Sequence, residues 1–215
     1  MVKLKVCGMR DSENIRQLIE LQPNYIGFIF SDQSPRFVGE DLDQELLLSI
    51  PRQIRKVGIF VNSNFDFILK TVRKYGLDWV QLHGQETPEF CRQLRSKGIG
   101  IIKAFAMGAD FNFRQLNNFK PHCDFFLFDT KGAAPGGNGQ TFDWQLLGQY
   151  DNDKPFFLSG GFEIKHLDLL PKLSHLNLHA IDINSRFEIS PGMKDIAKIK
   201  ELIDRLGEGK LAAEK

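Results

Sequence analysis

The sequence contains little cysteine and almost no net charge. Its three cysteines, Cys7, Cys91 and Cys123, are widely spaced and odd in number, which argues against a disulfide framework and against a cysteine-based zinc site. The formal net charge is +1, from 28 basic and 27 acidic residues. No basic field is therefore present to hold a nucleic acid backbone.

Long apolar runs are also absent. No run approaches the roughly 20 residues that span a membrane, and the charged N-terminus lacks the apolar core of a signal peptide. We therefore expect a cytoplasmic protein with no membrane or nucleic acid partner. The hydrophobic content of 42% supports a sizeable core, and the length is within reach of one large domain.

The sequence does contain a regular alternation of short apolar runs and helical patterns. The apolar runs cover residues 4–7, 25–30, 56–61, 79–84, 101–107, 125–129, 155–158 and 179–183. Helical patterns follow them at 11–21, 42–50, 65–72, 88–97, 113–119, 142–150, 164–173 and from about 193. Thr87 and Pro88 have the residue types of a helix N-cap and first position.

These eight strand–helix units predict an α/β fold. Strands that are apolar on both faces and joined by helices are typical of a parallel sheet covered on both sides. Eight near-equal units favour a single closed (β/α)₈ barrel over a doubly wound open sheet. We expect the barrel domain to cover residues 1–209, with Gly207 and Gly209 ending the last helix and 210–215 forming a frayed tail.

The loops that follow the strands form the active-site face of such a barrel. Cys7 ends the first strand and is a candidate nucleophile or base, although a free cysteine is often only a small buried hydrophobe. Asp129 follows four apolar residues, so it either caps the next turn or faces the pocket. In the pocket, desolvation would favour its protonated form and suit it to act as an acid.

Other strand ends carry candidate binding residues. Gln81 and His83 end the fourth strand, and a lone histidine there is equally consistent with a packed strand residue. Arg36 lies in the loop after the second strand and can clamp a carboxylate with two parallel hydrogen bonds or be simply solvated.

The loops after strands seven and eight contain Gly160-Gly161 and Asn184-Ser185. Glycine-rich turns in these two loops often bind phosphate, although glycine and serine also serve ordinary turns. Residues 132–139 form a glycine-rich stretch that is interpreted either as a lid over the site or as a surface loop.

Taken together, these motifs resemble the family of N-(5′-phosphoribosyl)anthranilate isomerases, which act in tryptophan biosynthesis. The resemblance covers nearly the whole chain in order. It rests on the segments Lys5–Gly8, Ser34–Arg36, Val57–Asn62, Gln81–Gly84, Phe128–Thr130, Gly136–Gly139, Thr141–Trp144, Leu158–Gly161, Asp182–Ser185 and Pro191–Asp195.

The resemblance implies an Amadori rearrangement of phosphoribosylanthranilate, with no metal and no other cofactor. It implies Cys7 as general base, Asp129 as general acid and Arg36 as the ligand of the anthranilate carboxylate. The same resemblance implies phosphate binding by the two loops at Gly160-Gly161 and Asn184-Ser185. Such a site needs Asp129 protonated and Cys7 ionised, so we expect the surroundings to favour both states. Arg186 departs from the small residue usual in the family and places a long cation beside the predicted phosphate loop.

Two other functions are also compatible with these residues. One is a different phosphosugar isomerase or synthase on a related barrel; Cys7 at the first strand, with no lysine or glutamate there, favours the isomerase. The other is a non-catalytic phosphate-binding barrel, which would not need both Cys7 and Asp129. The expected partner is a small phosphosugar substrate, and either a monomer or a homodimer is consistent with the sequence.

Overall fold

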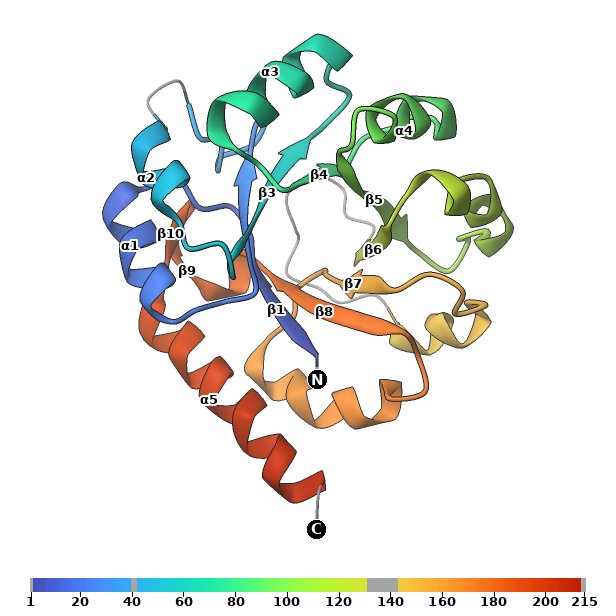
Figure 1. Ribbon diagram of the computed structural model, residues 1–215. Coiled ribbons are helices and arrows are strands. Elements are labelled where there is room, and N and C mark those ends of the chain that lie inside the picture. The colour runs from blue at the N-terminus through green and yellow to red at the C-terminus, as the bar shows by residue number, and fades with distance from the viewer. Residues whose placement is uncertain (1, 40–41, 131–142, 214–215) are drawn as a thin grey trace.

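Eight parallel strands close into a barrel in chain order, β1 to β8 (Figure 1). The computed structural model describes residues 2–39, 42–130 and 143–213, with side chains described up to residue 207. The strands are β1 (Lys3–Val6), β2 (Tyr25–Ile29), β3 (Arg55–Phe60), β4 (Trp79–Leu82), β5 (Gly100–Met107), β6 (Phe125–Thr130), β7 (Phe156–Leu158) and β8 (Leu178–Ile183). The predicted barrel is confirmed, and the open sheet is excluded.

Helical segments connect the strands and surround the barrel (Figure 1). The α-helices are α1 (Ser12–Glu20), α2 (Gln44–Ser49), α3 (Phe65–Tyr75), α4 (Pro88–Arg95) and α5 (Ile196–Ala213). The 3₁₀ segments are η1 (Phe113–Asn118), η2 (Lys120–His122), η3 (Trp144–Gln149), η4 (Ile164–Leu173) and η5 (Ser185–Phe187). The predicted helices at 142–150 and 164–173 are therefore present as 3₁₀ helices, a type that the spacing of apolar residues does not distinguish.

Helix starts follow from local side-chain chemistry. Asp11, Asp43, Asn64 and Thr87 each cap a helix by accepting a hydrogen bond from a backbone N–H in its first turn. Pro88 occupies the first position of α4, as predicted. These caps fix where each loop after a strand ends, and so limit how far the loop residues can extend over the barrel mouth.

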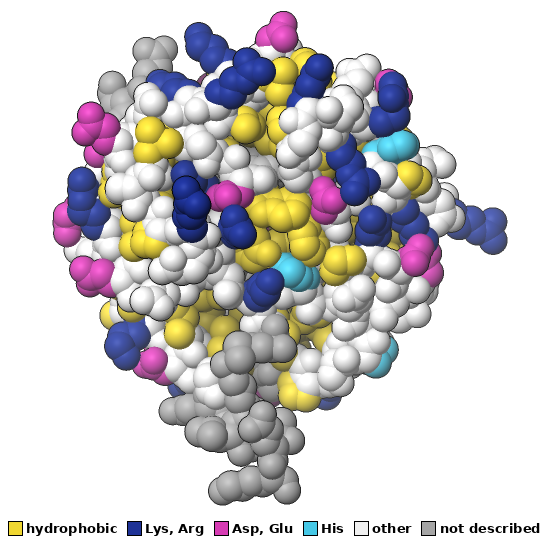
Figure 2. All heavy atoms as spheres, viewed as in Figure 1, with side chains coloured by type: hydrophobic (Ala, Val, Ile, Leu, Met, Phe, Trp, Pro, Cys, Tyr) yellow, Lys and Arg dark blue, Asp and Glu magenta, His cyan; other side chains and the backbone are white. Residues whose placement is uncertain are grey.

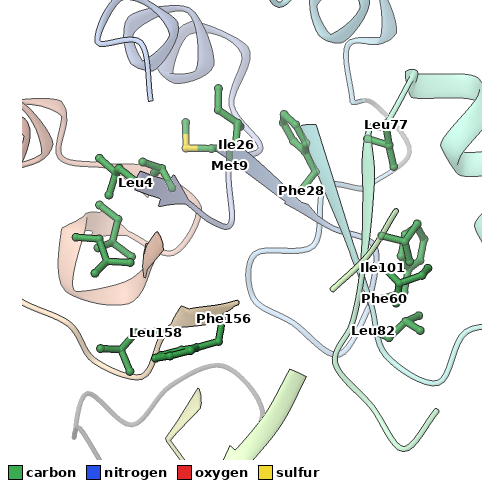
Figure 3. Packing of buried hydrophobic residues seen from close by; sticks show 14 of the residues in the cluster. Leu4, Met9, Ile26, Phe28, Phe60, Leu77, Leu82, Ile101, Phe156 and Leu158 are labelled. Carbon is green, nitrogen blue, oxygen red and sulfur yellow. The ribbon is translucent and has the colours of Figure 1, made fainter. Parts of the chain in front are cut away.

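Side chains alternate between the barrel interior and the shell under the helices, because successive residues of a strand point to opposite faces. The interior cluster includes Cys7, Ile59, Ile102, Leu127 and Phe157. The larger outer cluster includes those labelled in Figure 3, which lie between the strands and the surrounding helices: Leu4, Met9, Ile26, Phe28, Phe60, Leu77, Leu82, Ile101, Phe156 and Leu158. The same alternation places Lys5 with Cys7, Gln81 with His83, and Leu127 with Asp129.

The segment after β8 differs from the prediction. We expected the last helix to begin near Met193, but Met193–Lys194 is strand β10 and pairs antiparallel with β9 (Glu188–Ser190). Gly192 lies in the turn between them with φ of 85°, a conformation that favours glycine. At the other end of the last helix, Gly207 and Gly209 do not terminate α5, which continues to Ala213.

None of the helices among the described residues is both long and apolar enough to cross a membrane. Figure 2 shows hydrophobic side chains at the centre of one face, surrounded by charged side chains of both signs. The glycine-rich stretch 132–139, interpreted above as a lid or a surface loop, lies outside the described residues.

Candidate active site

Cys7 lies directly after β1 and is held in the barrel by its own backbone. Its N–H donates to the Ile183 carbonyl on β8 at 2.9 Å, and the side chain is 5% exposed. Gly8 follows with φ of 78°, and a Cβ there would lie 2.8 Å from both Arg36 Cδ and Asn184 Oδ1. The glycine therefore lets the loops after β2 and β8 approach the cysteine.

Charged side chains surround the Cys7 thiol. Burial raises the pKa of the Cys7 thiol and the Asp182 carboxylate adds to this, while the ammonium groups of Lys5 and Lys194 act to lower it. The net direction is upward, so the expectation that the surroundings favour the ionised thiol is wrong for the protein without substrate. The physical reason is that desolvation of a thiolate outweighs the two cations.

Arg36 is buried and is engaged by Glu188 of β9. Its Nε and Nη2 donate to the two carboxylate oxygens at 2.8–3.0 Å. Lys194 of β10 donates to the same carboxylate and, at 2.7 Å, to Asn184 Oδ1. Burial alone would raise the pKa of Glu188, but Arg36 and Lys194 outweigh it and hold that pKa below its usual value. Arg36 is thus not a solvated arginine, since a buried anion holds its guanidinium at the barrel mouth.

A second polar chain joins β4 to β6. Gln81 Nε2 lies 2.8 Å from His83 Nδ1, and His83 Nε2 lies 3.2 Å from Asp129 Oδ2. Because the amide nitrogen only donates, His83 Nδ1 accepts in this arrangement and Nε2–H points to the carboxylate. Asp129 also accepts from the N–H of Thr130 at 2.9 Å. The structure therefore joins three of the predicted site residues, Gln81, His83 and Asp129, in one series of polar contacts.

Asp182 lies between these two groups of residues. It pairs with Lys5 in the register of β1 and β8, and Lys5 Nζ lies 2.7 Å from its Oδ2. Burial raises the pKa of Asp182 and Asp129 adds to this, while Lys5 and His83 oppose it. Its other oxygen, Oδ1, is buried and has no hydrogen-bond partner within the described part of the chain. Asp182 thus interacts with Cys7 on one side and with Asp129 on the other.

The predicted phosphate loops follow β7 and β8, which are neighbours in the barrel. Gly160 and Gly161 have φ of 88° and 73°, and a Cβ on Gly160 would lie 2.1 Å from Thr130 Oγ1. Ser185 begins the short η5 segment. Arg186 Nε lies 4.0 Å from Glu163 Oε1, so an ion pair connects the two loops.

Four buried charged residues of the site were not singled out in the sequence: Lys5, Asp182, Glu188 and Lys194. For Lys5 and Asp182 a signal was present, since each interrupts an apolar strand at an inward position. For Glu188 it was not. Lys194 lies within the segment Pro191–Asp195 that carries the resemblance, but the hairpin that brings both residues to the site was expected to be loop and helix.

The arrangement brings a cysteine and an aspartate to the carboxyl end of a parallel barrel, with a buried arginine and the loops after β7 and β8 around them. Known proteins with the same sequence pattern identify the family. The sequence profile of the family described as N-(5′phosphoribosyl)anthranilate (PRA) isomerase matches residues 4–205. The chain belongs to this family. The resemblance found in the sequence is thereby confirmed.

Individual members of the family match this chain over most or all of their length. The N-(5′-phosphoribosyl)anthranilate isomerase of Parabacteroides distasonis is 40% identical over 204 residues, which cover 94% of this chain and 92% of the relative. The crystal structure of the Thermotoga maritima phosphoribosyl anthranilate isomerase is 30% identical, with a TM-score of 0.85 over 97% of this chain and 100% of that one. A further family structure, 29% identical with a TM-score of 0.80, covers 94% of this chain and 97% of its own. It holds reduced 1-(o-carboxyphenylamino)-1-deoxyribulose 5-phosphate.

Proposed function

We propose that this chain converts N-(5′-phosphoribosyl)anthranilate into 1-(2-carboxyphenylamino)-1-deoxyribulose 5-phosphate, in the tryptophan pathway, with Cys7 as base and Asp129 as acid. The observation that carries the assignment is their placement. Cys7 and Asp129 lie at inward-facing positions at the carboxyl ends of β1 and β6. The buried Asp182 interacts with both. Membership of the isomerase family and the reduced product analogue bound in a relative support the reaction.

The chemistry proceeds in two proton transfers. Asp129 donates a proton to the ribose ring oxygen, the C1′–O bond breaks, and the lone pair of the anilino nitrogen forms the C1′=N bond. The resulting protonated Schiff base makes the C2′ proton acidic. The Cys7 thiolate removes that proton, the electron pair of the C2′–H bond forms the C1′=C2′ bond, and the π electrons of the C1′=N bond return to nitrogen. The resulting enolamine tautomerises to the ketone. Each step uses a positioned side chain of this chain as general acid or base.

The polar chain of Gln81 and His83 orients the acid. With Gln81 donating to Nδ1, the Nε2–H of His83 fixes the direction of the Asp129 carboxylate. The His83 side chain is 34% exposed, which leaves part of it accessible to a bound substrate. Asp182 Oδ1 offers a buried acceptor for a substrate hydroxyl.

Arg36 binds the anthranilate carboxylate in this mechanism. The Glu188 carboxylate holds the guanidinium of Arg36 at the barrel mouth, and the planar guanidinium has the geometry to bind a substrate carboxylate through two parallel hydrogen bonds. The phosphate binds the loop at Gly160 and Gly161 and the loop at Asn184 and Ser185, which follow the neighbouring strands β7 and β8.

The partner, compartment and assembly follow from the same proposal. The partner is a small phosphosugar with no further cofactor, and the compartment is the cytoplasm. The assembly is a monomer or a homodimer; one solved relative, from Thermotoga maritima, is described as a dimeric enzyme made monomeric.

The test is turnover of phosphoribosylanthranilate generated in situ, followed as loss of its fluorescence, with mass spectrometry of the product. We expect rapid loss of signal and a product of unchanged mass, because the reaction is an isomerisation. Phosphoribosylaniline, which lacks the carboxylate, should react with a KM raised by about tenfold or more, since a charged hydrogen bond contributes about 1.5–3 kcal/mol. A folded protein that leaves phosphoribosylanthranilate unchanged would overturn the proposal.

A further inference from the structure

Lys5 is a lysine buried in the interior of the barrel. It precedes Cys7 by two residues on the same inward face of the chain, and its side chain is fully buried. Its ammonium donates to Asp182 Oδ2 at 2.7 Å, and Cys7 is among the groups that raise the pKa of Lys5. Asp182 in β8 uses one of the three N–H donors of the ammonium, so a further donor is available to the neighbouring thiol.

Stability does not explain a lysine at this position. A buried ion pair can usually be replaced by apolar residues of similar volume with little loss of stability. The neighbouring interior positions are apolar, among them Val57, Ile59 and Leu127. The charged pair lies one inward position before the cysteine, which points to a role in the chemistry.

Cys7 meets charges from several elements. Lys5 of its own strand and Lys194 of β10 act on the thiol as cations, and Asp182 of β8 acts on it as an anion. On the β2 side the neighbour is the uncharged Gly27, where an added Cβ would lie 2.9 Å from Sγ. His83 of the β4 end and Asp129 of β6 act on Asp182, and Arg36 acts on Lys194.

The two cations differ in how they meet the sulfur. Lys194 directs its hydrogen bonds to Asn184 and Glu188, so it acts on Cys7 through space. Lys5 has one such partner, Asp182, and it lies two residues before Cys7 on the same inward face of the chain. A hydrogen bond from a cation favours the ionised form of its acceptor, and Lys5 is therefore the group best placed to stabilise the thiolate.

We propose that Lys5 is the positioning residue that makes Cys7 usable as a base: anchored by Asp182, its ammonium donates to the sulfur and stabilises the thiolate. The thiol proton passes to solvent water, and the resulting thiolate remains hydrogen bonded to Lys5. This role rests on the proposed function, in which Cys7 removes the C2′ proton.

The test measures the thiol directly. In a Cys91→Ala, Cys123→Ala background, Cys7 is the only thiol, and cysteine labelled with ¹³C at Cβ reports its ionisation by NMR as pH is raised. We expect Lys5→Met to raise the midpoint by about one pH unit or more, so that the thiolate fraction at neutral pH falls about tenfold. The kcat/KM pH profile of the enzyme should shift in the same direction.

Lys56→Met is the matched control. Lys56 is also a buried lysine on a strand, but it donates to the carbonyls of Leu47 and Tyr75, away from Cys7. This variant should titrate as the parent does. A Cys7 midpoint that Lys5→Met leaves unchanged, or that Lys56→Met shifts equally, would overturn the proposal.

A second comparison covers the case in which Lys5→Met fails to fold, because it leaves Asp182 buried without its cation. Asp182→Asn and the double variant Lys5→Met, Asp182→Asn differ only in the lysine, and the double variant contains no unpaired charge from this pair. The midpoint of the double variant should be higher. Because the titration needs no substrate, a wild type that lacks turnover would refute the proposed function separately, without deciding the role of Lys5.

Discussion

Glu188 pairs with two buried cations, Arg36 and Lys194, and its replacement by glutamine tests how the site holds Arg36. The side chains of Arg36, Glu188 and Lys194 are 7%, 5% and 0% exposed. Three hydrogen bonds join Arg36 to the carboxylate. Glu188→Gln keeps the shape of the side chain but removes its charge.

The expected loss of stability is large for so small a change. Removing one partner of a buried ion pair costs about 3–5 kcal/mol, because the other charge is left uncompensated. Here two cations lose their anion, while the amide oxygen still accepts one hydrogen bond, so we expect about 3 kcal/mol. For a chain of this size that corresponds to a fall in Tm of about 6–12 °C. Arg36 should also lose its orientation, which raises KM for phosphoribosylanthranilate more than it lowers kcat.

Thermal unfolding monitored by circular dichroism measures the effect, and Glu89→Gln is the matched control. Glu89 also binds an arginine through both oxygens, at 2.6 and 2.7 Å to Arg92, but that pair is exposed on the surface of α4. Exposed pairs contribute little to stability, so its Tm should change much less. Equal Tm values for the two variants would refute the reasoning that burial makes Glu188 important.

Three further changes test other parts of the structure. Gly160→Ala should lower the free energy of unfolding by about 1–3 kcal/mol in a urea titration and raise KM, because φ of Gly160 is 88° and the new Cβ would collide with Thr130. The control Gly148→Ala places its Cβ in open space and should change the free energy of unfolding by less than about 0.5 kcal/mol in the same titration. Gln81→Leu should lower kcat by about tenfold or more, since His83 loses its hydrogen bond. Tm should be retained, because the substitution also removes the Gln81 amide oxygen, which is buried and has no hydrogen-bond partner among the described residues. Burial lowers the pKa of His179 to about 4, so between about pH 6.5 and 4 the unfolded chain takes up a proton at this residue that the folded chain does not. The free energy of unfolding should keep its full value above this window and fall by about 1–3 kcal/mol as pH decreases through it. The variant His179→Phe should remove this loss.

Much of the fold was predictable because the chain repeats one simple pattern. Each strand is apolar on both faces, and several helices begin with a capping residue such as Asp11 or Thr87. Strand ends in a parallel barrel face the same way, so the positions of Cys7 and Asp129 in the sequence suffice to place both on one side of the molecule. Local chemistry and a global rule were enough for these residues.

The parts that failed depend on contacts between segments far apart in sequence. No local signal shows that Glu188 binds Arg36, because 152 residues separate them. The β9–β10 hairpin was missed because its two strands are very short and one precedes α5 directly. The pKa of Cys7 was expected to fall, but the balance between burial and the charges of Lys5, Asp182 and Lys194 emerges only when β1, β8 and β10 come together.

The measurement that tests the central claim most directly is turnover of phosphoribosylanthranilate by Cys7→Ala and Asp129→Asn, alongside binding of the reduced product analogue. If Cys7 is the base and Asp129 the acid, kcat should fall by about 10²–10⁴-fold in each variant, while both remain folded and still bind the analogue. If either variant retains wild-type kcat, the acid–base assignment at the barrel mouth is wrong.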